Sequence, residues 1–316
     1  GEIDKAIERY LGELDRADEV FEQTGTVLPE ARMERTLRKL EHLQKEAVRY
    51  RSIGQRMDET GETQVSLSDP DARSMATTAR MPRIVGYNVQ TAVEANHHLI
   101  VAHEVTMLGF DRDALSMMAA AANDVMTTDQ LTAIADKGYY KSEEIVASEE
   151  AGISVVVPKP MTSNAAARGQ FDKADFAYDS DKDVYVCPAG KQLTYRFTGQ
   201  QDGKAIRSYW SGACADCVIK DKCTASKERR VRRWEKEDVL ERVQERLDAD
   251  PAQLAVRSMT VEHPYGTIKS WMGATHFKMR RLKNVATEMA LHVLAYNMTR
   301  VMNLMGIPAM IAAMKA

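Results

Sequence analysis

The pattern that most restricts how this chain can fold lies between Tyr87 and Pro158, where β-rich and helical segments alternate. Six segments follow one another there, at residues 87–93, 99–105, 112–126, 131–135, 142–150 and 153–158. The first segment alternates in polarity and is β-rich, the second follows it, and His97-His98 lies between them, which predicts a β-hairpin. The third and fifth are helical in pattern, and the remaining two are short apolar strands. The order β, β, α, β, α, β predicts an α/β fold whose mixed sheet is flanked by helices.

The segments outside this pattern differ from it in character. Residues 1–60 carry apolar residues at helical spacing, interrupted at Thr24–Pro29, and predict a helical hairpin that forms an arm. Residues 61–160 contain the first part of the core. Residues 161–230 hold all four cysteines, with Gly, Asp, Lys and aromatic residues, and predict a small Cys-rich β insertion. Residues 231–316 are helical in pattern and complete the core.

Composition bounds the class of protein. The chain has 316 residues, 44% of them hydrophobic, which is enough to bury a sizeable core. No apolar run approaches the roughly 20 residues that cross a bilayer. The first residues are polar and acidic, unlike a secretory signal. We therefore expect a cytoplasmic protein with no membrane partner.

Net charge gives no indication of a polyanionic partner, because the formal value is −3. Nucleic-acid binding depends on local patches, however. Two basic runs are present: Lys227, Arg229, Arg230, Arg232 and Arg233, and then Lys278, Arg280, Arg281 and Lys283. Each run is either a DNA contact or an ordinary solvated face, and spacing alone favours the solvated face.

The cysteines suggest a second kind of site. Cys214 and Cys217 form a C-x₂-C pair, with Cys187 before them and Cys223 after them. Four thiolates suit tetrahedral Zn²⁺, and a closed site of this kind would be structural. The alternative is four reduced thiols.

Two carboxylates lie where chemistry is plausible. Asp136 follows a predicted buried strand, so it could ligate a divalent metal or cap the next helix. Glu262 lies two residues before Pro264, which predicts that it is close to a helix start or a bend. Lys269 follows two turns later, so the pair could form a metal ligand beside a phosphate contact, or an exposed polar face. His263 either supports Glu262 or packs at the surface, and surface packing is favoured. The three tryptophans are interpreted as core or edge packing residues and not as platforms that stack on bases: Trp210, Trp234 and Trp271.

Five motifs occur in order along the chain. They are Gly86-Tyr87-Asn88-Val89-Gln90, Ala135-Asp136-Lys137-Gly138-Tyr139-Tyr140, Cys187-Pro188-Ala189-Gly190, Val261-Glu262-His263-Pro264-Tyr265-Gly266-Thr267-Ile268-Lys269 and Ala295-Tyr296-Asn297. In these motifs the chain resembles the insertion-sequence DDE transposases, and the branch with a cysteine-bearing insertion between the second Asp and the Glu. The resemblance covers about residues 66–305.

The resemblance implies an RNase H-like catalytic domain that cleaves and transfers DNA strands during transposition. It assigns Asp136 and Glu262 as the second and third catalytic carboxylates, which hold Mg²⁺ or Mn²⁺. It assigns Lys269 as a DNA contact, joined in our prediction by Arg229, Arg230, Arg232, Arg233, Arg280 and Arg281. The implied partner is double-stranded DNA, both transposon ends and target, and the arm suggests a homodimer.

The first carboxylate of the family is not found. It belongs to an Asp-Gly-Ser/Thr motif upstream of the arm, and no such motif occurs here. Asp69 and Asp71 are interpreted as turn residues because Pro70 lies between them. Arg257 precedes Glu262 at an offset that does not match the family's arginine. We therefore expect an N-terminally truncated transposase that is inactive or strongly impaired alone; the alternative is a non-catalytic DNA-binding or dimerisation remnant.

Overall fold

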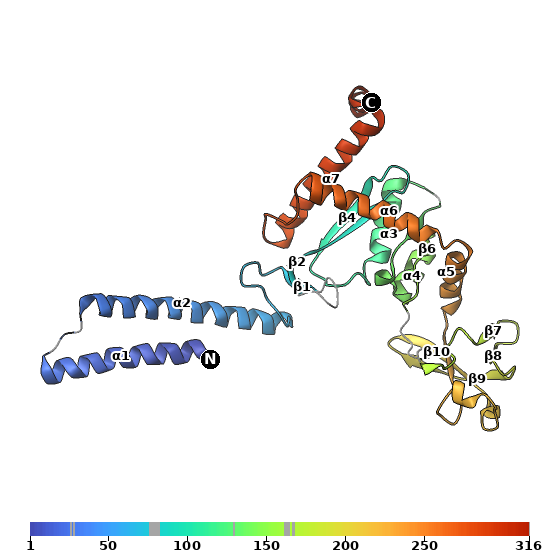
Figure 1. Cartoon of the computed structure of the whole chain (residues 1–316), viewed down its shortest axis with the longest axis horizontal. Coiled ribbons are helices and arrows are strands. Elements are labelled where there is room, and N and C mark those ends of the chain that lie inside the picture. The colour runs from blue at the N-terminus through green and yellow to red at the C-terminus, as the bar shows by residue number, and fades with distance from the viewer. Residues whose placement is uncertain are drawn as a thin grey trace. The chain divides into compact units, whose positions relative to one another are not determined.

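The structure is a computed structural model that describes residues 1–25, 27, 29–75, 83–128, 130–160, 165 and 168–315. Within the predicted arm break, Thr26 and Leu28 lie outside the described residues, as do positions 161–164 of the predicted insertion. The chain forms two compact units, Gly1–Tyr87 and Asn88–Ala316, and each is described by itself. Figure 1 shows the elements of both.

The first unit is built mainly from two long helices. Helix α1 spans Glu2–Thr24 and α2 spans Glu30–Thr60, within the range predicted for the arm. Both end at a glycine in the left-handed region, Gly25 with φ 65° and Gly61 with φ 67°, a conformation that glycine adopts without steric cost. A short antiparallel pair, β1 (Arg73–Met75) and β2 (Ile84–Gly86), completes the unit.

The second unit begins with the predicted hairpin. Strand β3 (Asn88–Val93) pairs antiparallel with β4 (Ile100–Thr106). Its turn contains His98 in the left-handed region. The helix α3 (Leu115–Met126) follows and packs against β4. This part of the expected secondary structure is confirmed.

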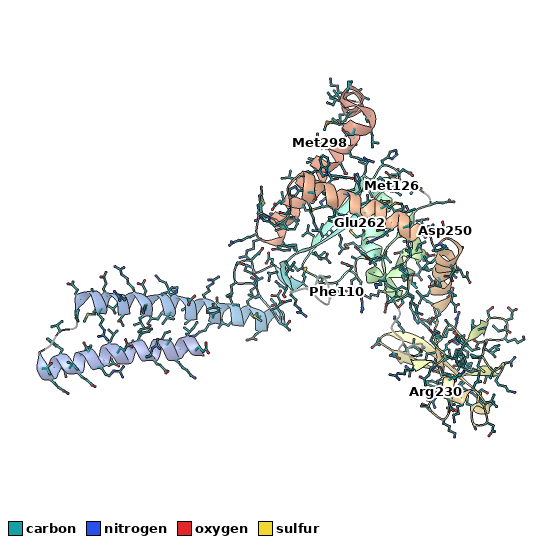
Figure 2. The ribbon with its side chains drawn as sticks, viewed as in Figure 1. Phe110, Met126, Arg230, Asp250, Glu262 and Met298 are labelled. Atoms are coloured by element: carbon teal, nitrogen blue, oxygen red, sulfur yellow. The ribbon has the colours of Figure 1, made fainter. Side chains whose placement is uncertain are left out.

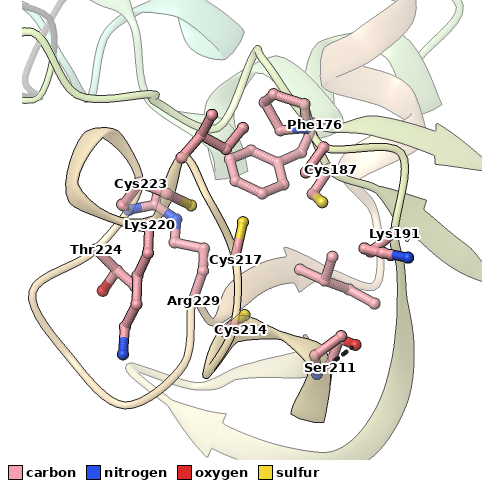
Figure 3. A pocket seen from close by; sticks show the side chains of 15 residues that line it. Phe176, Cys187, Lys191, Ser211, Cys214, Cys217, Lys220, Cys223, Thr224 and Arg229 are labelled. Carbon is pink, nitrogen blue, oxygen red and sulfur yellow. Dashed lines mark hydrogen bonds between the residues drawn. The ribbon is translucent and has the colours of Figure 1, made fainter.

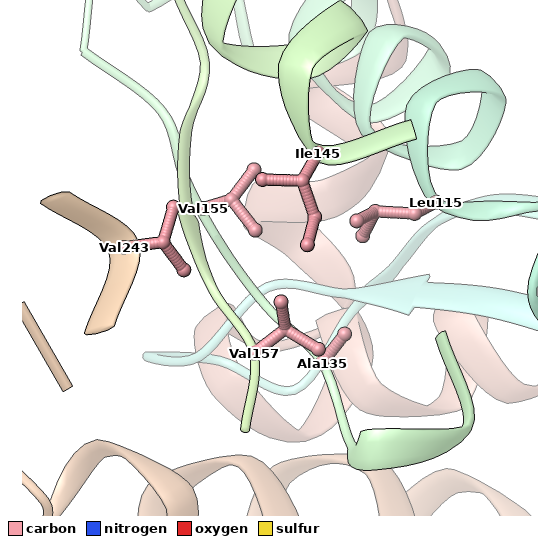
Figure 4. Packing of buried hydrophobic residues seen from close by; sticks show 6 residues of the cluster. All are labelled: Leu115, Ala135, Ile145, Val155, Val157 and Val243. Atoms are coloured by element: carbon pink, nitrogen blue, oxygen red, sulfur yellow. The ribbon is translucent and has the colours of Figure 1, made fainter. Parts of the chain in front are cut away.

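A parallel pair follows the hairpin. Strand β5 (Thr132–Ile134) lies beside β6 (Ser154–Val156), and α4 (Ser142–Glu150) connects them. Helix α4 begins at Ser142, as the range 142–150 predicts, and Lys141 is its N-cap. The core around this pair is an apolar cluster shown in Figure 4, formed by Leu115, Ala135, Ile145, Val155, Val157 and Val243.

The two strand pairs are not hydrogen-bonded into one mixed sheet among the described residues, which departs from the predicted arrangement. Side chains from two helices form hydrogen bonds with backbone groups of the hairpin. The Val89 carbonyl accepts a hydrogen bond from the Tyr265 hydroxyl at 2.9 Å. The amide of Asn297 bonds both the N–H and the C=O of Ile100, at 3.0 and 2.8 Å. These contacts fix helices α6 and α7, described below, to the hairpin.

The cysteine-bearing segment forms its own antiparallel sheet. Its five strands are ordered β11-β10-β9-β8-β7. They are β7 (Ala177–Asp179), β8 (Val184–Val186), β9 (Gln192–Gln201), β10 (Lys204–Trp210) and β11 (Val231–Trp234). A second core packs here, from Phe176, Tyr185, Leu193, Tyr209 and Val231. Two 3₁₀ turns between β10 and β11, η3 (Gly212–Cys214) and η4 (Lys220–Lys222), lie beside Cys217 and Cys223.

Helices complete the chain, as the sequence predicts. They are α5 (Glu237–Ala249), α6 (Gln253–Gly266), the π-helical turn η5 (Thr267–Trp271), α7 (Leu282–Met305) and α8 (Ile307–Lys315). The prediction that Pro264 marks a helix start was wrong, because α6 runs through it. The helix changes to π geometry at Thr267, three residues after Pro264. None of the described helices is long and apolar enough to span a membrane.

Candidate functional site

Asp136 lies at the carboxyl end of the parallel strand pair. The Ala135 amide still donates to the Val156 carbonyl at 3.0 Å, and the chain then turns into η1 (Lys137–Tyr139). Asp136 Oδ1 accepts the backbone N–H of Gly138 at 2.7 Å, so the side chain is the N-cap of this turn. Its side chain is 46% exposed, so it is fixed by the cap and still accessible from outside. The capping and ligand interpretations are therefore compatible.

The second carboxylate oxygen of Asp136 forms an ion pair with an arginine. Arg257, in α6, donates from Nη2 to Asp136 Oδ2 at 3.1 Å. The Arg257 side chain is 24% exposed, so part of the pair is removed from water. The sequence did not assign this role to Arg257, because its offset from Glu262 matched no pattern. The ion pair fixes α6 to the end of β5.

A second carboxylate that the sequence did not single out faces the same place. Asp111, between β4 and α3, accepts from Asn88 Nδ2 at 2.7 Å and from Gln90 Nε2 at 2.6 Å, both on Oδ1. A Cβ atom placed on Gly138 would lie 2.9 Å from Asp136 Oδ1 and 3.6 Å from Asp111 Oδ2. The absence of a side chain at Gly138 therefore leaves both carboxylates facing one small space.

Tyr139 is connected to Asp111 through the side chain of Gln90. Its hydroxyl donates to Gln90 Oε1, and Gln90 holds Asp111 through its amide nitrogen. Burial raises the pKa of Tyr139, and the charges of Asp111 and Asp136 raise it further. The hydroxyl therefore stays protonated near neutral pH and remains a donor. The Gln90 amide is oriented by this network, so its nitrogen is directed to Asp111.

Glu262 lies on α6 but not on the face that carries Arg257. Five residues separate them, which is roughly 140° around the helix at 100° per residue. The buried residues Thr260 and Pro264 are on the Arg257 side, and Glu262 is exposed. Its Oε1 accepts the Ser258 hydroxyl at 2.9 Å. Figure 2 labels Glu262 on its helix.

The carboxylates do not form a complete metal site. Oxygen donors are the ligands that Mg²⁺ prefers, so the chemistry of Asp136, Asp111 and Glu262 suits it. In the described part of the chain, however, no group of three or more His, Cys, Asp or Glu residues is close enough to hold a metal ion. The group of α6 that contacts Asp136 is Arg257.

The basic residues predicted to contact DNA fall into two groups. Arg233 is only 7% exposed and bonds Glu241 and Tyr185, which makes it part of the fold. Arg229 is half-buried over the Phe176 ring. The other residues predicted to contact DNA are exposed: Arg230, Arg232, Lys269, Arg280 and Arg281.

The four cysteines line a single pocket beside the second core (Figure 3). Phe176, Leu193 and Ile219 form part of its apolar wall. Burial raises the pKa of the Cys223 thiol; Arg229 opposes this shift, and the charges of the other three thiols add to it. The four thiols are therefore within electrostatic reach of one another, although they are not in metal-binding contact.

His263 and the three tryptophans differ in how they contact the fold. His263 donates or accepts at the Tyr296 hydroxyl, 3.0 Å away, and its ring lies 5.1 Å from that of His98, as expected for a packing residue. Trp210 and Trp234 are partly buried. Trp271 is 89% exposed, so its interpretation as a packing residue was wrong.

These features define a class: an α/β protein with carboxylates at the ends of its strands and a cation-bearing helix across them. Residues 186–302 match the family model described as "Transposase DDE domain", which supports a DDE transposase. Glu262 and the four cysteines lie inside the matched residues, and Asp136 lies before them. No curated protein matches, and no solved structure does.

Proposed function

We propose that the chain carries the catalytic domain of a DDE transposase, with an RNase H-like core and a Cys-rich insertion, that cleaves and transfers DNA strands. The observation that carries the proposal is Asp136, which a cap holds at the end of β5 while α6 is fixed to it by Arg257. The family match over residues 186–302 adds to it. Transposases act on DNA, and DDE domains generally use divalent metals such as Mg²⁺.

In this proposal Asp136, Glu262 and Asp111 are the candidate oxygen ligands. When bound, Mg²⁺ or Mn²⁺ would stabilise the attacking and leaving oxygens of the phosphodiester. Arg257 would have to leave Asp136 Oδ2 or share it, because its cation occupies that oxygen. Glu262 would have to turn toward the strand end, because α6 contacts Asp136 through Arg257.

Localised oxidation tests the metal ligands without depending on turnover. Fe²⁺ replaces Mg²⁺ in oxygen sites and, with ascorbate and peroxide, cuts the peptide backbone beside the ion. We expect cuts near Asp136, Asp111 and Glu262 that excess Mg²⁺ suppresses. Asp136→Asn should abolish all of them, and Glu245→Gln, an exposed change on α5, should not. Cuts near Asp136 alone would exclude Glu262 as a ligand, and no localised cut would exclude the site.

Cleavage of DNA carrying the element's ends tests the reaction itself. Because the family's first carboxylate is not found in this chain, protein with Mg²⁺ or Mn²⁺ is expected to nick the ends weakly at most, and Asp136→Asn or Glu262→Gln should abolish the nicking that remains, since each loses an interaction made in the transition state. Robust turnover by the wild type would contradict this expectation. DNA binding that is equal in all three proteins, without cleavage in any, would instead favour the non-catalytic DNA-binding or dimerisation remnant.

Exposed basic residues support DNA as the partner. We assign phosphate contacts to Lys269, Arg280 and Arg281 near η5, and to Arg230 and Arg232 on the five-stranded sheet. Arg229 and Arg233 are left out because their guanidinium groups are committed to the fold. The salt dependence of binding should therefore weaken when the exposed residues are replaced.

We also propose a structural Zn²⁺ in the cysteine pocket. Cys187, Cys214, Cys217 and Cys223 line one cavity, and four thiolates suit this ion in chemistry and number. Small closing movements of η3 and η4 would be needed. Protein purified under reducing conditions should contain about one zinc per chain, and Cys217→Ser should lose it together with several degrees of melting temperature. Four titratable thiols and no zinc after zinc supplementation would contradict the site.

A further inference from the structure

The charged residues of the cysteine pocket are cations. Among the described residues that line it, the charged ones are Lys191, Lys220 and Arg229, and none is an Asp or Glu. Glu228, the acid next to Arg229 in the chain, is paired with Arg230 at 3.0 Å. A pocket lined by cations without a carboxylate favours negative charge inside it. The lining groups that can become anions are the four thiols.

Arg229 has a buried donor in this pocket. Its side chain is half-buried over the Phe176 ring, and its Nη1 donates to the Cys223 carbonyl at 3.4 Å. Figure 3 shows Arg229 beside Cys223. Its Nε atom is buried and has no hydrogen-bond partner among the described residues. Lys191, by contrast, is exposed, so water and salt screen its charge.

The unpaired donor of Arg229 suits a pocket that holds thiolates. A buried N–H without an acceptor is costly, and arginine cannot avoid that cost by losing its proton. The sulfur of a neutral thiol is only a weak acceptor. A thiolate is charged, and hydrogen bonds to charged acceptors are the stronger ones. Cysteines become thiolates when they bind a metal ion, so the donor fits the metal-bound form of the pocket.

We infer that Arg229 positions the cysteine ligands and balances their charge: with Zn²⁺ bound, it donates Nε–H to the thiolate of Cys223. The inference rests on the structural Zn²⁺ proposed above. One Zn²⁺ and four thiolates together carry two negative charges, which are costly in an apolar pocket unless cations and N–H donors lie beside them. Arg229 supplies both. It acts through Cys223 and is therefore a positioning residue, not a metal ligand.

Competition with a chelator for Zn²⁺ measures this role in the whole chain. Arg229→Gln should bind Zn²⁺ about 10- to 100-fold more weakly than the wild type, the usual cost of losing a group that bonds to a metal ligand. Arg229→Lys keeps the charge without the planar donor group and should lose less. Lys227→Gln removes the same charge from a nearby exposed residue and should bind as the wild type does. Equal affinity in Arg229→Gln and Lys227→Gln would overturn the inference.

Two further measurements separate this role from packing on Phe176. Arg229→Gln should lower the melting temperature of the zinc-loaded protein and leave that of the chelator-treated protein unchanged or raised, because the metal-free pocket loses only a buried cation with an unpaired donor. With Co²⁺ in place of Zn²⁺, the sulfur-to-metal absorption band should shift in Arg229→Gln and not in Lys227→Gln. An equal fall in melting temperature with and without zinc, or an unshifted band, would overturn the inference.

The wild type separates this inference from the zinc site itself. A wild type that binds no Zn²⁺ would overturn both. Zinc bound by the wild type and equally well by Arg229→Gln would overturn the role of Arg229 and leave the four-cysteine site standing.

Discussion

At the scale of single residues, the candidate site depends on the lack of a side chain at Gly138. Gly138 has a φ that any residue can adopt, so its role is steric and not conformational. It leaves room for Asp136 Oδ1, which would lie 2.9 Å from a Cβ at this position. Asp111 Oδ2 faces the same space. The site residues are therefore arranged around a missing side chain.

Gly138→Ala should disturb Asp136 with little effect on the fold. The added methyl would push the carboxylate away from its cap, so we expect about tenfold weaker Mn²⁺ binding or cleavage. The melting temperature should fall by only a few degrees because the change is at an exposed turn. Gly212→Ala, where nothing lies within 4 Å, is the matched control. Equal activity in both variants would contradict the steric role.

At the scale of elements, one ion pair joins two helices and a strand. Arg246 of α5 donates from both terminal nitrogens to Glu149 of α4, at 2.6 and 2.7 Å, and also to the Val155 carbonyl at 2.8 Å. Glu149 Oε1 in turn accepts the Val155 amide at 2.7 Å. Burial raises the pKa of Glu149, but the hydrogen bonds from Arg246 and Val155 and the charge of Arg246 outweigh it, so the pKa is lowered.

A lowered pKa sets the direction of the pH dependence. The contribution of Glu149 to stability is fully present above its unfolded pKa of about 4.3 and is lost as pH falls through the folded value. Glu149→Gln should therefore reduce the free energy of unfolding by about 2 kcal/mol at pH 7. The difference from wild type should shrink below about pH 4. Urea titrations at several pH values measure it, with the exposed Glu245→Gln as control; a difference independent of pH would contradict the assignment.

Periodicity predicted the elements better than their contacts. The hairpin, the parallel pair and the C-terminal helices follow from apolar spacing, and the clustering of Cys214, Cys217 and their partners follows from a short motif. The rotation of α6 about its axis determines whether Arg257 or Glu262 faces Asp136. Sequence spacing gives the angle between these two residues but not which of them faces the strand end, so this could not be predicted. The burial of Arg233 depends on Glu241, eight residues away on another element. Within a basic run, nothing local indicates such a partner.

At the scale of the whole molecule, the two units differ in what they contain. Gly1–Tyr87 contains α1 and α2, and Asn88–Ala316 contains the two apolar clusters described above and every candidate site residue. Several large apolar side chains on the helices are exposed: Leu11, Val20, Phe21, Leu37 and Val48. Such side chains along a helical pair suit self-association. Self-association through the first unit therefore stays a prediction, which a shortened chain tests.

Removing the first unit should separate folding from association. A chain of residues 88–316 should unfold cooperatively, within a few degrees of the full chain, because its cores are internal to it. Light scattering should find the full chain dimeric and the shortened chain monomeric. A shortened chain that still dimerises would move the contact to the second unit, and one that fails to fold would contradict the independence of the units.

The Asn297 amide has a consequence for how the protein avoids unwanted association. An unfilled strand edge offers N–H and C=O groups to any passing chain and invites sheet growth. At Ile100 both groups are already bound by one side chain from α7. A side chain of α7 thus forms the hydrogen bonds that a neighbouring strand would form at the first residue of β4. Another chain could pair with this edge only after displacing Asn297.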